Sequence, residues 1–488
     1  MAAAAKQKPQ TDAEKAAAVI ARIRTDPVWF ATEILGESLW SKQRAILESV
    51  RDNPRTAARS CHGVGKTFTA SVVVPWWLAA WPDEAVAVVT APTWLQVKEQ
   101  VWREIHARLG KSKIGFPPAN LTDLTLGDNW YAIGLSTDKP ERFQGFHAGH
   151  LLLLVDEASG VDERIFEAGE GFLTADGARI LLIGNPTQLA GQFHRAFTSE
   201  RALWQQIHVS AFDSPNFTGE QVPQDVARRL VGPAWVEEKR QKWGEASPLY
   251  QVRVLGDFPS TSDNTVVGLA AAEAAQQREP DGVVVPLVVS CDVARFGSDE
   301  TVIATRIGNR LELVDAYVGR DTMHTAGRIL EVAIGLADRH GKRKAATVQI
   351  VVDDAGVGGG VTDRLREDGR FSVEAFNGGQ AAVTIDEERG EPAYPNRRSE
   401  AWFAFADELD ALSLDGDEQL LADLVAPTYR LDSRGRRVVE AKEETKKRLG
   451  RSPDRADAVL LLCAPGAPEA ASSAWTDAYA EQLARISG

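Results

Sequence analysis

The sequence predicts an α/β protein with two successive domains, and three observations support this prediction. Apolar, strand-like runs alternate with helical patterns through the first half, and several of these runs end in glycine or acidic residues. The second half repeats the alternation and places aspartates where strand-like runs end. The 488 residues are also too many for one core, because single cores stop growing at about 250–300 residues.

Composition limits the class of protein. Hydrophobic residues make up 44% and charged residues 25%, as in ordinary globular chains. No run approaches the ~20 apolar residues of a membrane helix, and the start lacks the apolar core of a signal peptide. Cys61, Cys291 and Cys463 have no CxxC spacing, so we expect neither disulfides nor a zinc site, in a reducing cytoplasm. The net charge of −14 weighs against a nucleic-acid-binding protein, but a local basic stripe can still bind phosphates on an acidic chain.

The stretch SCHGVGKT resembles a phosphate-binding loop. A strand-like entry precedes it and an apolar helical pattern follows, which is the context such a loop requires. Gly63 and Gly65 would let backbone N–H groups approach phosphate oxygens. Lys66 would reach the outer phosphates and Thr67 would bind Mg²⁺. Ser60 replaces the usual first glycine and affects only the first turn; the alternative is a chance glycine-rich turn before a helix.

Two further strand-like runs end in residues that suit nucleotide hydrolysis. HLLLLVDEAS is an apolar run that ends in Asp156 and Glu157, typical of a strand buried on both faces. Asp156 would hold Mg²⁺ and Glu157 would polarise the attacking water. ARILLIGNPTQ ends near Asn185, the candidate sensor of the γ-phosphate, with Thr187 second. The alternative for the acid pair is a solvent-facing strand end.

Three outlying features complete the first half. AVAVVTAPTWLQVKEQVWREI predicts a strand that ends at Thr93 and leads into an amphipathic helix. Gln43 would read the adenine edge, or else lie on a helix surface. Arg142, in a glycine-containing loop, would stabilise γ-phosphate charge in a neighbouring subunit, or be structural. It is preferred to Arg103 and Arg108, which sit within a helix.

Aspartates at three places in the second half predict a ribonuclease-H-like nuclease. A strand-like run ends in Asp292, another ends at Asp353 and Asp354 before a glycine-rich turn, and Asp454 and Asp457 open an apolar helix. Asp353 is preferred to Asp354 because neighbouring strand residues point to opposite faces. The alternative is that VDDAGVGGG forms a second phosphate-binding turn.

Phosphodiester cleavage explains why such carboxylates would converge. Two divalent ions about 3.5–4 Å apart activate water and stabilise the leaving oxygen. Hard oxygen ligands suit Mg²⁺ or Mn²⁺. Asp292, Asp353 and Asp457 are the expected ligands, and Asp454 is a further ligand or a residue stabilised by the helix dipole.

A basic stretch precedes the helix that carries Asp457. RLDSRGRRVVEAK predicts a hairpin with SRG at its turn. Its cations would neutralise DNA phosphates without reading sequence, or form a solvated charge run interrupted by glutamates. They are Arg434, Arg436, Arg437, Lys442, Lys446, Lys447 and Arg448. Arg397 and Arg398 begin another helix and would serve DNA or structure.

From Asp26 to Cys463, these motifs resemble the large terminase subunit of tailed bacteriophages. SCHGVGKT, LLLLVDEAS and LLIGNPT occur in that family's order, followed by DVARFGSDETVI, VDDAGVGG and SPDRADA. The resemblance implies a P-loop ATPase that uses ATP and Mg²⁺, followed by a nuclease that uses Mg²⁺ or Mn²⁺. It also implies ATP-driven movement of double-stranded DNA through the portal into the procapsid, with cutting of concatemeric DNA.

The resemblance further implies partners and a location. These are the portal protein, the small terminase subunit and a homo-oligomeric ring on the procapsid, with a monomer in solution, all in the host bacterial cytoplasm and transiently at the portal vertex. The competing hypotheses are a helicase-like ATPase–nuclease of repair or restriction, for which a second motor domain is not seen, and a non-enzymatic DNA-binding scaffold. The expected segments are an N-terminal tail (1–25), the ATPase (26–210), a linker or lid (211–282), the nuclease (283–470) and a C-terminal tail (471–488).

Overall fold

The chain folds into two compact units in the computed structural model. One comprises Met1–Lys239 with Tyr250–Pro259, and the other Arg240–Leu249 with Ser260–Gly488. The segment expected as a linker or lid is therefore shared between the units. The structure describes residues 11–137, 140–143, 145–171, 175–259, 264–294, 299–340, 348–386 and 390–466, so the expected C-terminal tail lies outside them. None of the helices in these ranges has the length and apolar character needed to cross a bilayer.

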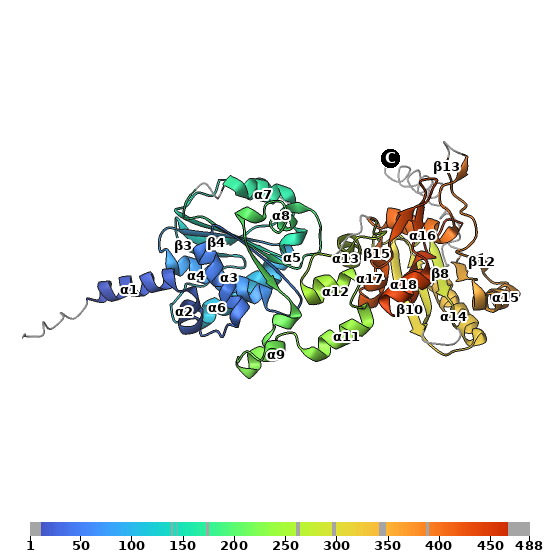
Figure 1. Ribbon diagram of the computed structural model, residues 1–488, viewed down its shortest axis with the longest axis horizontal. Helices are drawn as coiled ribbons and strands as arrows, with labels where there is room; N and C mark the ends of the chain where they lie inside the picture. The colour runs from blue at the N-terminus through green and yellow to red at the C-terminus, as the bar shows by residue number, and fades with distance from the viewer. Residues whose placement is uncertain are drawn as a thin grey trace, which may run out of the picture. The chain divides into compact units, whose positions relative to one another are not determined.

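The first unit, drawn in blue to green in Figure 1, is built on a seven-stranded sheet. Its strand order is β3-β4-β2-β5-β6-β1-β7. All neighbouring strands are parallel except β3 and β4. The strands are β1 (Arg55–Ser60), β2 (Ala85–Thr90), β3 (Asp123–Gly127), β4 (Trp130–Gly134), β5 (His150–Asp156), β6 (Arg179–Gly184) and β7 (Gln205–Val209). Every residue of β2 is buried, as expected of a parallel strand covered on both faces. This is the predicted doubly wound P-loop fold.

Helices cover this sheet. The first after the phosphate loop, α4 (Lys66–Ala80), is apolar on all sides and almost wholly buried, which is the pattern of a helix enclosed by other elements. The other helices of this unit, not all of which lie on the sheet, are α1 (Asp12–Thr25), α2 (Pro27–Trp29), α3 (Ser41–Asp52), α5 (Trp94–Gln96), α6 (Arg103–Lys111), α7 (Glu163–Glu170), α8 (Gly191–Arg195), α9 (Pro215–Thr218), α10 (Gln224–Ala227) and the start of α11 (Pro233–Trp243). The strand predicted to end at Thr93 ends at Thr90, and Thr93 instead caps α5 by accepting from the N–H of Gln96 (3.2 Å).

The strand order determines where the first site can form. β6 lies between β5 and β1, and the three strands are parallel. Because carboxyl ends of parallel strands meet at one edge of a sheet, the segments after them become neighbours. The segment after β6 is therefore placed between the phosphate loop and the acid pair.

The second unit contains a six-stranded sheet in the order β12-β11-β8-β9-β10-β15. β9 pairs antiparallel with both β8 and β10. β11 pairs parallel with β8 and β12, and β15 pairs parallel with β10, which gives the ribonuclease-H-like topology. The strands are β8 (Leu287–Asp292), β9 (Thr301–Ile307), β10 (Arg310–Tyr317), β11 (Val348–Asp353), β12 (Ser372–Phe376) and β15 (Ser413–Leu414).

Helices pack on both faces of this second sheet. Residues of α14 (Thr322–His340) and α15 (Gly359–Asp368) share one core cluster with Cys291. The adjacent Ser290 faces the other way, and its hydroxyl donates to the carbonyl of Ala458 in α19 (Asp454–Leu460; 2.7 Å). The remaining helices are α12 (Pro248–Tyr250), α13 (Leu269–Gln277), α16 (Arg397–Glu408), α17 (Glu418–Leu424) and α18 (Lys442–Leu449).

Two hairpins complete this unit. The predicted basic hairpin is confirmed: β16 (Tyr429–Leu431) pairs antiparallel with β17 (Arg437–Val439). Gly435, with φ of +78°, lies in its turn, where a left-handed backbone favours glycine. The other hairpin joins β13 (Ile385–Asp386) to β14 (Glu391–Pro392).

Candidate active sites

The phosphate loop has the backbone that its glycines predict. Gly63 and Gly65 adopt left-handed conformations, with φ of +69° and +79°. Gly65 directly precedes α4, so the loop and the positive end of the helix dipole lie together. Ser60 is the last residue of β1 and is buried in extended backbone. A glycine's conformational freedom is not needed there, which explains how serine fits at this position.

Asn185 joins the three segments of the first site. Its Oδ1 accepts from Lys66 Nζ at 2.9 Å, and its Nδ2 donates to the Ser60 carbonyl at 2.6 Å. Its backbone N–H donates to Glu157 Oε2 at 3.3 Å. Lys66 also donates to the carbonyl of Cys61 (3.2 Å). The residue predicted as a sensor is therefore in direct contact with both the loop lysine and Glu157 of the acid pair.

The acid pair lies beside the phosphate loop. Thr67 Oγ1 donates to Asp156 Oδ2 at 2.9 Å, so the two expected Mg²⁺ ligands are adjacent. Burial raises the pKa of Asp156, and the neighbouring Glu157 carboxylate raises it further. Glu157 has a φ of +48°, a strained conformation for a residue with a side chain. A Cβ on the facing Gly184 would come within 2.9 Å of the Ala158 nitrogen, so glycine makes room for this turn.

A cavity of about 440 Å³ opens beside the loop and reveals residues that sequence reasoning missed. The predicted residues on its wall are Gly63, Gly65, Lys66, Thr67 and Glu157. The additional ones are Phe68, Gln100, Arg103, Glu104, Arg108 and Arg229. Arg103 and Arg108 had been set aside as helix positions. That helix follows β2, whose carboxyl end lies at the same sheet edge, and this was the signal for placing it at the site.

Three side chains that were considered for the nucleotide site either lie away from the cavity or are already bound by other protein groups. Arg142 is exposed in the short turn η3 (Pro140–Phe143), and the described cavity wall does not include it. Gln43 is buried and its Nε2 lies 2.7 Å from the position of a Cβ on Gly65, so it packs against the loop. Arg108 is neutralised by Glu37 (2.7 Å) and Glu104 (2.6 Å).

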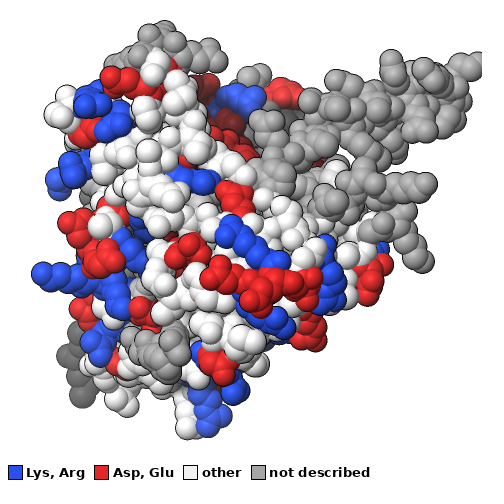
Figure 2. All heavy atoms as spheres, turned by 90° about the vertical axis from the view of Figure 1, so that its right-hand side faces the viewer, with Lys and Arg blue, Asp and Glu red and all other residues white. Residues whose placement is uncertain are grey.

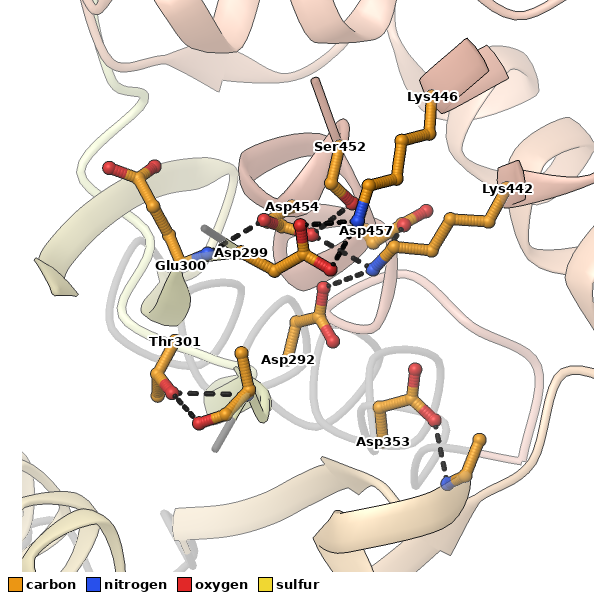
Figure 3. Close-up of polar contacts among 12 residues, drawn as sticks. Asp292, Asp299, Glu300, Thr301, Asp353, Lys442, Lys446, Ser452, Asp454 and Asp457 are labelled. Carbon is orange, nitrogen blue, oxygen red and sulfur yellow. Dashed lines mark hydrogen bonds and ion pairs between the residues drawn. The ribbon is translucent and has the colours of Figure 1, made fainter. Parts of the chain in front are cut away.

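A lysine holds the acidic site of the second unit together (Figure 3). Lys442, at the start of α18, places its Nζ 2.8 Å from Asp292 Oδ2, 3.0 Å from Asp454 Oδ1 and 3.0 Å from Asp457 Oδ2. Asp292 ends β8, and the other two aspartates lie in the first turn of α19. Three of the four predicted ligands therefore converge on one cation, from segments far apart in the chain.

Asp353, the fourth predicted ligand, lies beside this group. Cys291 pairs with Val352 in the sheet, so Asp292 and Asp353 follow at the ends of adjacent parallel strands. Asp353 Oδ1 accepts from the N–H of Ala355 at 3.0 Å. Among the described residues, no three His, Cys, Asp or Glu side chains already have the spacing to hold one metal ion.

Other groups neutralise or orient the same carboxylates. Arg398 donates to Asp457 Oδ1 at 2.8 Å, and the N–H of Glu300 donates to Asp454 Oδ2 at 2.8 Å. The hydroxyl of Ser452 donates to the other oxygen of Asp454. Arg398 and Lys442 had been considered for DNA contact, but the structure places both against the aspartates.

Burial and charge act in opposite directions on the ionisation of this group. Burial raises the pKa of Asp292, and Lys442 offsets part of that increase. Burial lowers the pKa of Lys442, but the Asp457, Asp292 and Asp454 carboxylates outweigh it and raise that pKa above its usual range. Burial also raises the pKa of Asp457, but Arg398 and Lys442 outweigh burial and hold this pKa below its ordinary value. The result is a buried, charged cluster built around a central cation.

Acids pair with most of the basic stretch. Arg436 contacts Asp432 at 2.9 Å, and Arg434 contacts Glu391 at 3.3 Å. Arg448 and Lys446 likewise pair with Glu440 and Asp299, both at 2.6 Å. Figure 2 shows Lys and Arg interspersed with Asp and Glu on the face that it draws. The charge run is therefore largely balanced by neighbouring acids.

The two folds together define a chain with a P-loop NTPase unit followed by a ribonuclease-H-like unit that contains a buried acidic cluster. No family model matches it. It is 25% identical over 461 residues to the "Probable terminase, large subunit" of Enterobacteria phage P7, covering 90% of each chain. The resemblance to phage large terminase subunits that the motifs indicated is confirmed by this relative.

Two solved structures are also similar. One is a variant of the nuclease domain of the large terminase subunit of bacterial virus Sf6 with manganese: 21% identity, TM-score 0.35, covering 41% of this chain and 98% of that one. The other is the large terminase of a thermophilic bacteriophage in complex with ADP: 14% identity, TM-score 0.38, covering 87% and 98%. The topologies described above, and not these scores, define the two folds.

Proposed function

We propose that this protein is an ATP-driven translocase of double-stranded DNA combined with a metal-dependent endonuclease, acting in phage genome packaging. The observation that carries the proposal is that one chain contains both a complete phosphate-loop site and a buried aspartate cluster. The similarity to the terminase subunit of phage P7, over nine tenths of both chains, supports joining the two activities in one packaging role.

In the first site, the geometry supports hydrolysis of ATP. The loop N–H groups and Lys66 would bind the phosphates, while Thr67 and Asp156 would hold Mg²⁺, which supplies charge neutralisation at the phosphates. Glu157 lines the cavity, where it would orient water and accept its proton. Asn185 would change partners when Lys66 moves from its carbonyl and amide contacts to phosphate.

In the second site, the donor set fits a divalent cation because the carboxylates of Asp292, Asp454 and Asp457 already surround the positive charge of Lys442. Asp292, Asp353 and Asp457 would be the main ligands for Mg²⁺ or Mn²⁺, and these ions would activate water and stabilise the leaving oxygen. Asp454 already accepts hydrogen bonds at both oxygens, so it would position Lys442 or act as an additional ligand. Arg398 would hold the Asp457 carboxylate in its present orientation.

ATP turnover tests the first activity. Glu157→Ala should abolish turnover and keep nucleotide binding, whereas Glu167→Ala, on an exposed part of α7, should behave as wild type. Wild-type turnover by the Glu157 variant would refute its assignment.

Plasmid cleavage in Mn²⁺ tests the second activity. Asp353→Ala should stop cleavage and leave ATP turnover intact. Asp354→Ala is the matched control, because its side chain follows on the opposite face of the chain. Cutting at the wild-type rate by the Asp353 variant would refute the ligand set.

The proposed assembly follows from the resemblance. The partners would be the portal protein and the small terminase subunit, with a ring on the procapsid in the host cytoplasm and Arg142 acting across subunits. Co-sedimentation with purified portal tests this part, and strand displacement without portal would favour the helicase-like alternative. DNA contact by the cations of the basic stretch is retained as part of the proposal.

A further inference from the structure

One arginine in the cavity wall comes from outside the sheet and its covering helices. Arg229 follows α10 and belongs to the segment that was expected to form a linker or lid. Its side chain is 74% exposed, and its ion pair with Asp225 is long, at 3.7 Å. The guanidinium is therefore beside the phosphate loop, and no ion pair shorter than this one holds it among the described residues.

The backbone that carries Arg229 is attached to the phosphate loop. The N–H of Val231 donates to the carbonyl of Gly63 at 2.8 Å, and Val231 is buried against that glycine. A Cβ on Gly63 would lie 3.3 Å from the Val231 Cβ, so the two segments are in contact. Ser214 Oγ donates to the Val231 carbonyl at 2.9 Å, and Asn216 Nδ2 donates to that of Ala227 at 2.9 Å. Hydrogen bonds therefore anchor the backbone of this segment to the loop, whereas the Arg229 side chain is exposed.

The charges of the cavity wall favour a phosphate partner for this arginine. Arg108 is already neutralised by Glu37 and Glu104. Lys66 is held mainly by two neutral oxygens, and its ion pair with Glu157 is long, at 3.9 Å. A nucleotide's phosphate chain brings several negative charges, and a guanidinium binds phosphate oxygens through two parallel N–H donors.

We propose that Arg229 binds the phosphate chain of the nucleotide and couples its presence to the segment from Ser214 to Val231. The inference rests on the proposed ATP site and extends it. When Arg229 closes on phosphate, the Val231–Gly63 hydrogen bond ties that movement to the loop itself. The chain then continues into α11, along which it passes from the first unit to the second at Lys239. Nucleotide binding would thus reach the connection between the units through a covalent path of a few residues.

Nucleotide affinity tests the contact. Fluorescent ADP and ATP-γ-S would be titrated into the full chain with Mg²⁺. Arg229→Ala should weaken binding about 10–100-fold, the effect of losing a hydrogen-bonded charge contact. Arg228→Ala removes an exposed neighbour that the described cavity wall does not include, and it should stay within about threefold of wild type. Arg229→Lys should recover part of the loss.

Hydrogen exchange separates this role from a structural one. Nucleotide should slow exchange in residues 227–231 of wild type and not of Arg229→Ala, and the two proteins should melt together without nucleotide. Unchanged affinity in Arg229→Ala, or a loss in Arg103→Ala alone, would overturn the inference. A wild type that binds no nucleotide would instead refute the proposed ATP site.

Discussion

Removing Lys442 should destabilise the nuclease-like unit and make it depend on added metal. The ammonium has three carboxylate partners at 2.8–3.0 Å, and those carboxylate side chains are only 6–8% exposed. Removing one partner of a buried ion pair costs about 3–5 kcal/mol. The lysine itself is 27% exposed, so we expect the lower end for Lys442→Ala, about 3 kcal/mol. For a unit of this size, that corresponds to a fall in Tm of about 6–12 °C.

Thermal melts in EDTA and in Mn²⁺ measure this effect. A divalent ion that binds the folded unit stabilises it by about 2.7 kcal/mol at a hundred times its Kd. In Lys442→Ala the ion would enter an open cluster, whereas in wild type it must displace or share the ammonium. Mn²⁺ should therefore raise the Tm of the variant by more than that of wild type.

Lys446→Ala is the matched control for this experiment. Lys446 lies on the same helix as Lys442 and pairs with Asp299 at 2.6 Å, but the side chains of Lys446 and Asp299 are 41% and 33% exposed. Such exposed pairs contribute about 0.2–1 kcal/mol, so its Tm should barely change. Equal melting of Lys442→Ala and wild type in EDTA, or equal shifts with Mn²⁺, would show that the cluster is not organised around this cation.

Three further variants test other parts of the structure. Gly256→Ala should lower the free energy of unfolding in urea by about 1–3 kcal/mol more than Gly36→Ala does. Both glycines have φ near +67°, but a Cβ at 256 would lie 2.6 Å from the Val209 carbonyl oxygen, whereas a Cβ at 36 would meet nothing within 4 Å. Equal losses of stability would contradict this packing. Gly184→Ala should displace Glu157 and reduce ATP turnover about tenfold or more while nucleotide still binds, and normal turnover would show that the tight contact is not needed. Burial raises the pKa of Asp213, but the Ser210 N–H and Lys42 outweigh burial, so the pKa in the folded protein is below the ordinary 3.8. The ionised Asp213 therefore stabilises the fold above pH 3.8, and this stabilisation is lost as the pH falls through the folded pKa. Asp213→Asn should consequently flatten the acid side of the curve of stability against pH.

The sequence by itself determined the fold class and indicated the candidate residues of both sites. Glycines at 63 and 65, an apolar strand before Asp156 and aspartates at later strand ends are local patterns, and each pattern reflects a local cause. A left-handed turn favours glycine, and a strand buried on both faces requires an apolar run. The basic hairpin was predictable for the same reason, because its turn chemistry lies within a few adjacent residues.

Only the tertiary structure decided which distant side chains meet. Lys442 and Arg398 looked like DNA-binding cations, and only the packing of α16 and α18 places them on Asp292 and Asp457. Arg229 joined the phosphate-loop cavity because Val231 bonds to Gly63, a contact that no local pattern encodes. Local patterns report the backbone that a residue adopts, whereas ion-pair partners depend on how segments far apart in the chain pack together.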